Sequence, residues 1–272
     1  MAESKFSAVK TRIRTALILV LILSIVLYLG ETAIYAFICL VSLLAQWEFL
    51  SLFYPGKEKL HFKILFCGLG VFHFLLSYFL PAFPLVFNIC AVALISAFTA
   101  LAGFTHENAW DNMKKAGLGF ISFIYLPVVF SFMSKFSLMQ QFLVLLIPIA
   151  SDTFAYFVGI AVGKHKIWVS VSPKKSVEGC AAGLLVSILI LLYFAYCQHV
   201  VTAPFPLLLL LGITLGVLAQ LGDFFESALK RTVAIKDSGT LLAGHGGVLD
   251  RTDSLLFTIT GFELFTLLLS VL

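Results

Sequence analysis

Long apolar stretches separated by short polar segments run along the whole chain, and none shows the strict alternation of a half-buried strand. A helix needs roughly 20 mostly apolar residues to cross the hydrocarbon core of a bilayer. The stretches of about that length are 15–30, 32–54, 62–80, 83–103, 116–133, 137–162, 178–197, 204–229 and 254–272. They are too long for the strands of a membrane barrel. The pattern therefore predicts an all-α, polytopic membrane helix bundle of about nine transmembrane helices.

Composition supports this prediction. Of the 272 residues, 61% are hydrophobic and only 12% are charged, whereas an ordinary soluble domain has about 25% charged residues. A soluble fold of this length leaves much of its chain facing water. The values therefore exclude a soluble globular domain, a disordered chain and a disulfide-stapled secreted domain. The net charge of +4 is too small to suggest nucleic acid as a partner.

Basic residues in the short loops indicate the orientation, because Lys and Arg collect on the cytoplasmic side. If the odd-numbered spans run outward, 17 of the 18 Lys and Arg residues fall on one side and Lys135 alone on the other. A wrong number of spans would scramble this sorting. We therefore expect a multi-pass integral membrane protein with a cytoplasmic N-terminus, located in a bacterial cytoplasmic (inner) membrane. We also expect a single integral membrane domain over 1–272, in which 1–136 has no recognisable motif and 137–272 contains the catalytic motifs.

Several acidic residues lie inside predicted spans, where a charge is costly and needs a partner or a function. Glu48 and Glu263 are isolated, and we expect each to hydrogen-bond a neighbouring helix. Asp152 lies between two hydroxyl residues in the sixth span, which favours a functional site over a packing role. The eighth span ends with polar residues on one helical face. This stripe comprises Asp223, Glu226, Ser227, Lys230 and Arg231.

An alternative explanation of the stripe is a helix end that emerges into water with i,i+4 ion pairs. It explains Lys230 and Arg231 well, but it explains Asp223 poorly, because Asp223 lies about two turns deeper. The long polar segment that follows, from Thr232 to Asp253, contains two glycine clusters that let a backbone approach a ligand closely. Asp250 or Asp253 could instead be a simple helix cap, and His245 taken alone could be a turn residue.

The polar loop between the sixth and seventh spans places Lys174, Lys175 and Ser176 just before a helix, where backbone N–H groups add to the lysine charge. Cytoplasmic lysines are also common without any binding function. With both loops on one side, the pattern predicts a polar cavity that opens to the cytoplasm. Carboxylates in such a cavity suit Mg²⁺, and Lys and Arg suit phosphate. These features together indicate phosphate chemistry at a membrane surface, with a water-soluble phosphate donor and a lipid acceptor.

The polar segments of the second half resemble the signature of the phosphatidate cytidylyltransferases, also called CDP-diacylglycerol synthases. The longest match runs from Ser227 to Asp253 with its spacing intact. Shorter pieces also resemble this family, namely Ser151-Asp152-Thr153, Ser172 to Gly179 and Gln220 to Ser227. Phe154, Ser176 and Ala243 depart from the family's commoner residues, but none of these changes removes a charged or hydroxyl group.

The resemblance implies that CTP and phosphatidate react in the presence of Mg²⁺ to give CDP-diacylglycerol and pyrophosphate, with the lipid bilayer around the enzyme. The resemblance does not decide whether the protein forms a homodimer or whether a monovalent cation joins the Mg²⁺. The catalytic residues that it implies are Asp223, Asp250, Lys230, Arg231 and His245. The substrate-binding residues are Lys174, Lys175, Ser176, Lys236, Asp237, Arg251, Asp152 and Glu226. The metal ligands are Asp223, Asp250, Asp253 and Ser227.

Three other classes of protein remain as alternatives. Intramembrane acids also occur in transporters and channels, but this chain shows no inverted repeat and its polar groups gather at one face. A transferase acting on a different lipid, such as a polyprenol, would share the nucleotide and metal motifs. A purely structural membrane protein would leave the deep Asp223 without an explanation. The sequence does not indicate which lipid tails are preferred or whether CTP is selected over dCTP.

Overall fold

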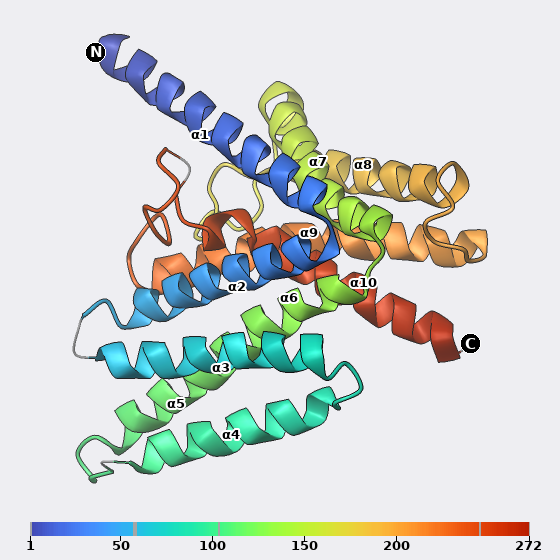
Figure 1. Ribbon diagram of the computed structural model, residues 1–272. Coiled ribbons are helices and arrows are strands. Elements are labelled where there is room, and N and C mark those ends of the chain that lie inside the picture. The colour runs from blue at the N-terminus through green and yellow to red at the C-terminus, as the bar shows by residue number, and fades with distance from the viewer. Residues whose placement is uncertain (1, 57–58, 103, 245, 272) are drawn as a thin grey trace. The chain divides into compact units, whose positions relative to one another are not determined.

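The computed structural model describes residues 2–56, 59–102, 104–244 and 246–271 (Figure 1). Apart from two isolated β-bridges, the regular structure in these residues is helical, which confirms the all-α class. The chain divides into two compact units. The first unit is Met1–Ser131 with Asp237–Asp250, and the second is Phe132–Lys236 with Arg251–Leu272. The glycine-rich segment therefore belongs to the first unit.

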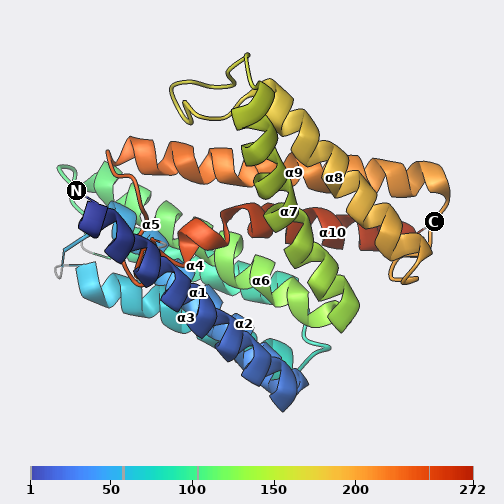
Figure 2. The same cartoon turned by 90° about the horizontal axis from the view of Figure 1, so that it is seen from above.

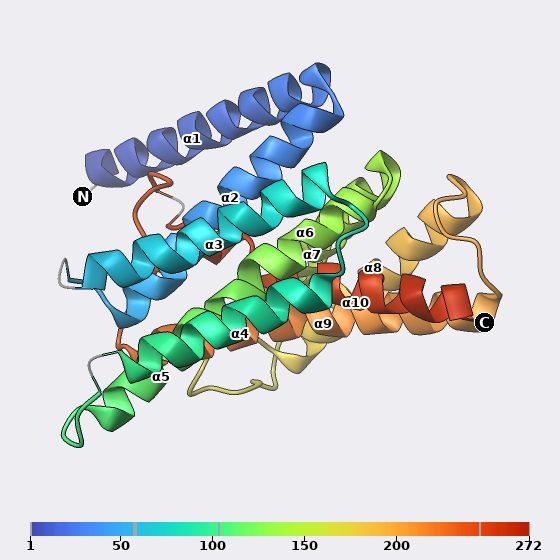
Figure 3. The same ribbon diagram turned by 60° about the horizontal axis from the view of Figure 1, so that its bottom comes forward.

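The first unit is a bundle of the N-terminal helices. Figure 3 shows α2 to α5 side by side, and contacts join α2 to α3, α3 to α5 and α4 to α5. Fully buried aromatic side chains such as Phe66 and Phe123 fill the spaces between these helices. The helices are α1 (Ala2–Leu29), α2 (Glu31–Phe53), α3 (Leu60–Phe79), α4 (Leu85–Leu101) and α5 (Ala109–Phe123).

A π-helical turn continues the fifth span at Ile124–Val128 and contains Pro127, which cannot donate a backbone hydrogen bond. Short helical segments then lead into the second unit, namely α6 (Val129–Phe132) and a 3₁₀ turn at Met133–Lys135. The whole span from Ala109 to Lys135 is longer than the predicted 116–133. Its first turns contain charged residues, so hydropathy alone places its start too late.

In the second unit, α7 packs on α8, α8 on α9 and α9 on α10, and α7 also contacts α9 and α10. Figure 2 shows α9 and α10 running side by side. The helices are α7 (Leu138–Val162), α8 (Val177–Tyr196), α9 (Phe205–Thr232) and α10 (Asp253–Val271), with a 3₁₀ turn at Leu249–Arg251. Ser137 and Gln140 form a capping box that fixes the start of α7.

All nine predicted spans coincide with apolar helices in the described residues. Seven of these helices are long and apolar enough to cross a membrane by length and composition, while Ile13–Leu29 and Leu85–Leu101 are shorter. Large apolar side chains such as Leu94 and Phe98 point outward, each 72% exposed. Such a surface suits lipid rather than water. The prediction of a polytopic membrane helix bundle is therefore confirmed.

Candidate functional site

Two intramembrane carboxylates of the second unit converge on one cation. The Lys175 ammonium forms an ion pair with Asp223 Oδ2 on α9 and lies 3.9 Å from Asp152 Oδ1 on α7. The same ammonium lies 4.6 Å from the ring centroid of Phe224. A loop lysine and acids from two helices thus form one group, which we call the Asp152–Lys175–Asp223 cluster.

The electrostatics of this cluster keep Lys175 charged. Burial acts to lower the pKa of Lys175, but the charges of Asp223 and Asp152 and the hydrogen bond to Asp223 outweigh it, so the pKa is raised above its usual value. Lys175 therefore remains an ammonium ion at neutral pH.

Local hydrogen bonds fix the loop that bears Lys175. The Ser176 side chain is buried and caps α8 by accepting a hydrogen bond from the Gly179 N–H at 3.2 Å. Glu178 accepts from the backbone N–H groups of Lys164 at 3.1 Å and His165 at 3.2 Å, and its Oε1 lies 2.6 Å from His165 Nδ1. These contacts tie both ends of the loop together next to Lys175.

The polar stripe on α9 contains two kinds of contact. Glu226 is fully buried and pairs with Lys230 at 2.5 Å. The i,i+4 pairing agrees with the helix-end explanation, but the burial does not, because that explanation places the pair in water. Asp223 instead pairs with Lys175 from another element and accepts a hydrogen bond from Ser227 Oγ at 3.3 Å. Arg231 is exposed and donates to the Ile235 carbonyl at 3.2 Å. The stripe therefore combines a structural ion pair with one acid that faces the cluster.

Asp253 opens α10 and is almost completely buried. Its Oδ1 accepts a hydrogen bond from the Ser254 N–H at 2.7 Å. A Cβ added at Gly222 would lie only 2.5 Å from the Asp253 carbonyl oxygen, so the two backbones touch beside Asp223. Asp253 also interacts electrostatically with Asp223 and Asp152. The start of α10 therefore adds a third acid next to the cluster.

The described residues contain no group of three His, Cys, Asp or Glu side chains arranged to hold a metal ion. The Lys175 ammonium lies between the carboxylates of Asp152 and Asp223. Among the other predicted site residues of the second unit, Lys174, Lys236 and Arg251 are exposed.

In the first unit, Asp250 organises the glycine-rich segment that precedes it. Its Oδ2 accepts hydrogen bonds from the backbone N–H groups of Ser238 and Gly247, both at 2.8 Å. Gly246 has a φ of +84°, a conformation that glycine adopts without steric cost. Asp237 is exposed, and His245 lies outside the described residues. The assignment of Asp250, Asp237 and His245 to the same site as the second-unit residues stays a prediction.

Glu48 is a residue whose contribution sequence reasoning underestimated. Its buried carboxylate on α2 accepts hydrogen bonds from the Leu249 N–H at 2.9 Å and the Ser238 hydroxyl at 3.3 Å. A Cβ at Gly247 would lie 2.3 Å from Glu48 Oε2, and one at Gly239 would lie 2.5 Å from Oε1. The carboxylate thus packs directly on the glycine-rich segment. A buried acid was visible in the sequence, but its partners lie about 200 positions later.

The fold and these contacts define a polytopic helical membrane protein in which buried acids are matched to lysines and backbone donors at the ends of the spans. A model of the cytidylyltransferase family matches residues 10–269. The chain therefore belongs to the cytidylyltransferase family, which is a family of nucleotidyltransferases.

Several relatives have the name phosphatidate cytidylyltransferase. The one from Bacillus subtilis is 38% identical over 177 residues, which cover 62% of this chain and 63% of that protein. The one from Staphylococcus haemolyticus is 32% identical over 254 residues, which cover 92% of this chain and 96% of the relative. A relative from Staphylococcus epidermidis is 46% identical over 109 residues, or 42% of its length. Two of these alignments thus span less than two thirds of the relative, whereas the Staphylococcus haemolyticus alignment spans nearly all of it.

Proposed function

We propose that this protein is a phosphatidate cytidylyltransferase, which transfers CMP from CTP to phosphatidate and yields CDP-diacylglycerol and pyrophosphate. The names of the relatives support this activity. The observation that carries the proposal is the Asp152–Lys175–Asp223 cluster, in which acids of two apolar helices converge on the ammonium of a loop lysine. With a divalent cation held by these carboxylates, such a site would suit a water-soluble polyanion that reacts with a lipid.

The chemistry needs no Ser, Cys or His nucleophile. A phosphate oxygen of phosphatidate forms a bond to the α-phosphorus of CTP, and the bond from that phosphorus to the bridging oxygen of the β-phosphate breaks. Pyrophosphate leaves with that electron pair. The attacking phosphate monoester is already anionic near pH 7, so little deprotonation is required. The main difficulty is to bring two polyanions together in line, which requires cations and precise positioning.

Basic side chains supply part of this positive charge. Lys175 is held in place by the capped start of α8 and by its two carboxylates. Lys230 is held by the buried Glu226, so Glu226 acts by positioning a cation. Lys174, Arg231, Lys236 and Arg251 are exposed at the ends of their helices and loops, where a phosphate can reach them.

Mg²⁺ is the proposed cofactor, and the oxygen donors gathered around Lys175 support it. Oxygens of Asp152 and Asp223 already face a shared cation, and Ser227 adds a hydroxyl beside Asp223. Carboxylate and hydroxyl oxygens are the ligands that Mg²⁺ prefers. Asp223 would hold the ion with Asp253 and Ser227, and the family resemblance adds Asp250. When bound, Mg²⁺ neutralises phosphate charge and helps to orient the nucleotide.

We further propose that the site opens to the cytoplasm of a bacterial cell. CTP is a cytosolic nucleotide, and phosphatidate is a membrane lipid. The predicted sorting of basic residues places the loops of Lys175 and Lys236 on the cytoplasmic side. The cytoplasmic (inner) membrane is then the location at which both substrates meet.

The test is the conversion of phosphatidate by purified protein in detergent micelles, with CTP and Mg²⁺ supplied. Asp223→Asn should lower kcat by at least about a hundredfold, the scale of losing a group that stabilises charge in a transition state. Glu263→Gln is the matched control, because Glu263 is also an acid within a span but pairs with Lys135 at 2.6 Å. Wild-type turnover in Asp223→Asn would refute the site assignment.

A second measurement separates an enzyme from a carrier. Vesicles containing the protein should show no CTP-independent uptake of protons or cations that Asp223→Asn abolishes. Such an uptake, together with no conversion of phosphatidate by the wild type, would contradict the transferase and support a transporter.

A further inference from the structure

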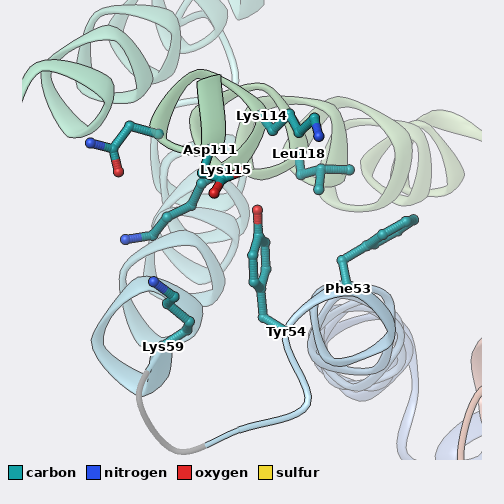
Figure 4. A pocket seen from close by; sticks show the side chains of 8 residues that line it. Phe53, Tyr54, Lys59, Asp111, Lys114, Lys115 and Leu118 are labelled. Atoms are coloured by element: carbon teal, nitrogen blue, oxygen red, sulfur yellow. The ribbon is translucent and has the colours of Figure 1, made fainter. Parts of the chain in front are cut away.

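The first unit contains a pocket that the proposed catalytic residues do not occupy. It has a volume of about 390 Å³. Its polar lining consists of Tyr54, Lys59, Asp111, Asn112, Lys114 and Lys115. Figure 4 shows the side chains of Lys59 and Lys115 approaching each other from different elements, with the Tyr54 hydroxyl pointing toward α5. We call this cavity the three-lysine pocket.

The charges around the three-lysine pocket do not balance. Among the described residues that line it, there are three lysines and one carboxylate, that of Asp111. Within the part of the chain that the structure describes, none of the three lysines forms an ion pair with a carboxylate. Lys59 and Lys115 also repel each other electrostatically. Bringing like charges together in a concave site is unfavourable, so the pocket is suited to an anion that offsets the surplus.

Aromatic rings hold two of these lysines. The Lys115 ammonium lies 5.0 Å from the ring centroid of Phe62, and the Lys114 ammonium lies 5.4 Å from that of Trp110. Cation–π contacts of this kind favour the position of an ammonium without neutralising it. The positive charge is therefore placed in advance and remains available to a ligand.

The pocket lies at the ends of three membrane helices. Tyr54 directly follows α2, Lys59 directly precedes α3, and Asp111 to Lys115 lie in the first two turns of α5. Helix ends of membrane spans lie near the lipid headgroups, where Tyr and Trp side chains are also enriched. A phosphate at that depth is what a lipid headgroup presents, and clustered lysines next to a span are a common mode of anionic lipid recognition.

We propose that the three-lysine pocket binds a phosphate group, and that an anionic lipid headgroup presents it. This site is additional to the proposed transfer reaction and does not depend on it. Phosphatidylglycerol is a suitable probe, because its phosphodiester lacks the phosphate monoester that the proposed reaction consumes. Inorganic phosphate is the matching soluble probe.

The first experiment measures how fast an amine-reactive acetylating reagent modifies individual lysines of the full-length wild-type protein, with peptides read by mass spectrometry. The protein is placed in nanodiscs of phosphatidylcholine alone, of phosphatidylcholine with phosphatidylglycerol, and of phosphatidylcholine with inorganic phosphate in the buffer. Lys10, exposed on α1 of the same unit, corrects for the general effect of a charged membrane on amine reactivity.

We expect phosphatidylglycerol to slow acetylation of Lys59 and Lys115 severalfold relative to Lys10. Slowing by phosphatidylglycerol alone supports a lipid headgroup. Equal slowing by inorganic phosphate supports a phosphate site but overturns the assignment to lipid. If neither probe slows Lys59 or Lys115 more than Lys10, the proposal is wrong.

The second experiment counts bound phosphatidylglycerol by native mass spectrometry. Lys59→Gln/Lys115→Gln should weaken the tightest lipid about thirtyfold, which corresponds to about 2 kcal/mol at 1.4 kcal/mol per tenfold. Lys10→Gln/Arg14→Gln removes the same charge from exposed positions of the same unit and should leave that affinity unchanged. Equal weakening by both double variants would point to general charge and contradict a specific pocket.

Discussion

Removal of the Glu48 carboxylate should loosen the glycine-rich segment of the first unit. Glu48 is buried on α2 and accepts hydrogen bonds from the Leu249 N–H at 2.9 Å and the Ser238 hydroxyl at 3.3 Å. In Glu48→Ala both hydrogen bonds to this carboxylate are lost while the surrounding structure stays packed. Glu48→Gln keeps one carbonyl oxygen but places an NH₂ group against donors and tightly packed glycines.

The expected change in the free energy of local opening follows from these contacts. A hydrogen bond to a charged acceptor contributes about 1.5–3 kcal/mol, and a buried N–H left unpaired costs about 1–3 kcal/mol. Loss of the Leu249 contact alone should therefore lower the local free energy of opening by about 1.5–3 kcal/mol. Since each 1.4 kcal/mol is a factor of ten, amide hydrogens of residues 237–250 should exchange about 10–100 times faster in Glu48→Ala. The exchange rate in Glu48→Gln should lie between the rates in Glu48→Ala and in the wild type.

The assay is hydrogen–deuterium exchange of the purified protein in micelles, read on peptides from residues 237–250. Glu31→Gln is the control, because Glu31 is an exposed acid on the same helix. Exchange through local opening reports the stability of this segment rather than of the whole protein. If the segment exchanges at the wild-type rate in Glu48→Ala, the carboxylate does not hold it and the reasoning fails.

Gly222→Ala should destabilise the protein by about 1–3 kcal/mol, because the added methyl group would lie 2.5 Å from a backbone oxygen of α10. Gly117→Ala, in open space on a helix, should be neutral or slightly stabilising, and thermal unfolding in one detergent compares the two. Ser176→Ala should cost about 1 kcal/mol through the lost cap of α8, measured in the same way. Because the pKa of Lys175 is raised in the folded state, its stabilising contribution is present at neutral pH and is lost as pH rises through that raised value. Unfolding followed from neutral to strongly alkaline pH should show this loss in the wild type and a smaller one in Lys175→Gln.

The helices could be predicted from the sequence because lipid leaves the backbone few choices. A spanning segment must satisfy its own N–H and C=O groups, so a long apolar stretch becomes a helix whatever its neighbours are. Two helix starts were the exceptions. Helix α1 begins at Ala2, although the first span was predicted from residue 15, and α5 begins at Ala109, although the fifth span was predicted from residue 116. The first turns of α5 contain Asp111 and two lysines, and a hydropathy pattern does not distinguish a polar helix end from a loop.

The pairing of distant residues could not be predicted from local pattern. Lys175 and Asp223 were both predicted site residues, but only the fold shows that they form an ion pair. Glu48 was expected to contact a neighbouring helix, whereas it binds a loop that follows it by 190 to 201 positions. The sequence contained a buried acid without a local partner, and spacing along one helix says nothing about a donor from another part of the chain.

The balance of charge around each buried acid distinguishes structural acids from those suited to a ligand. Glu226 is matched by Lys230 at 2.5 Å, and Glu263 by Lys135 at 2.6 Å. Each of these acids has one cation, which offsets the cost of burying it.

Asp152 and Asp223 differ, because they share the single ammonium of Lys175, and Asp152 retains 44% of its side-chain surface. Asp253 adds a further acid that interacts with both. Three acids of the second unit therefore gather around Lys175, and Lys230 and Arg251 also act on them electrostatically. The described lining of the three-lysine pocket in the first unit has three lysines and one carboxylate, which suits a phosphate. A purely structural bundle would gain stability by matching every acid and every lysine with its own side chains, so a shared lysine in one unit and, within the described residues, unpaired lysines in the other are where ligands are expected.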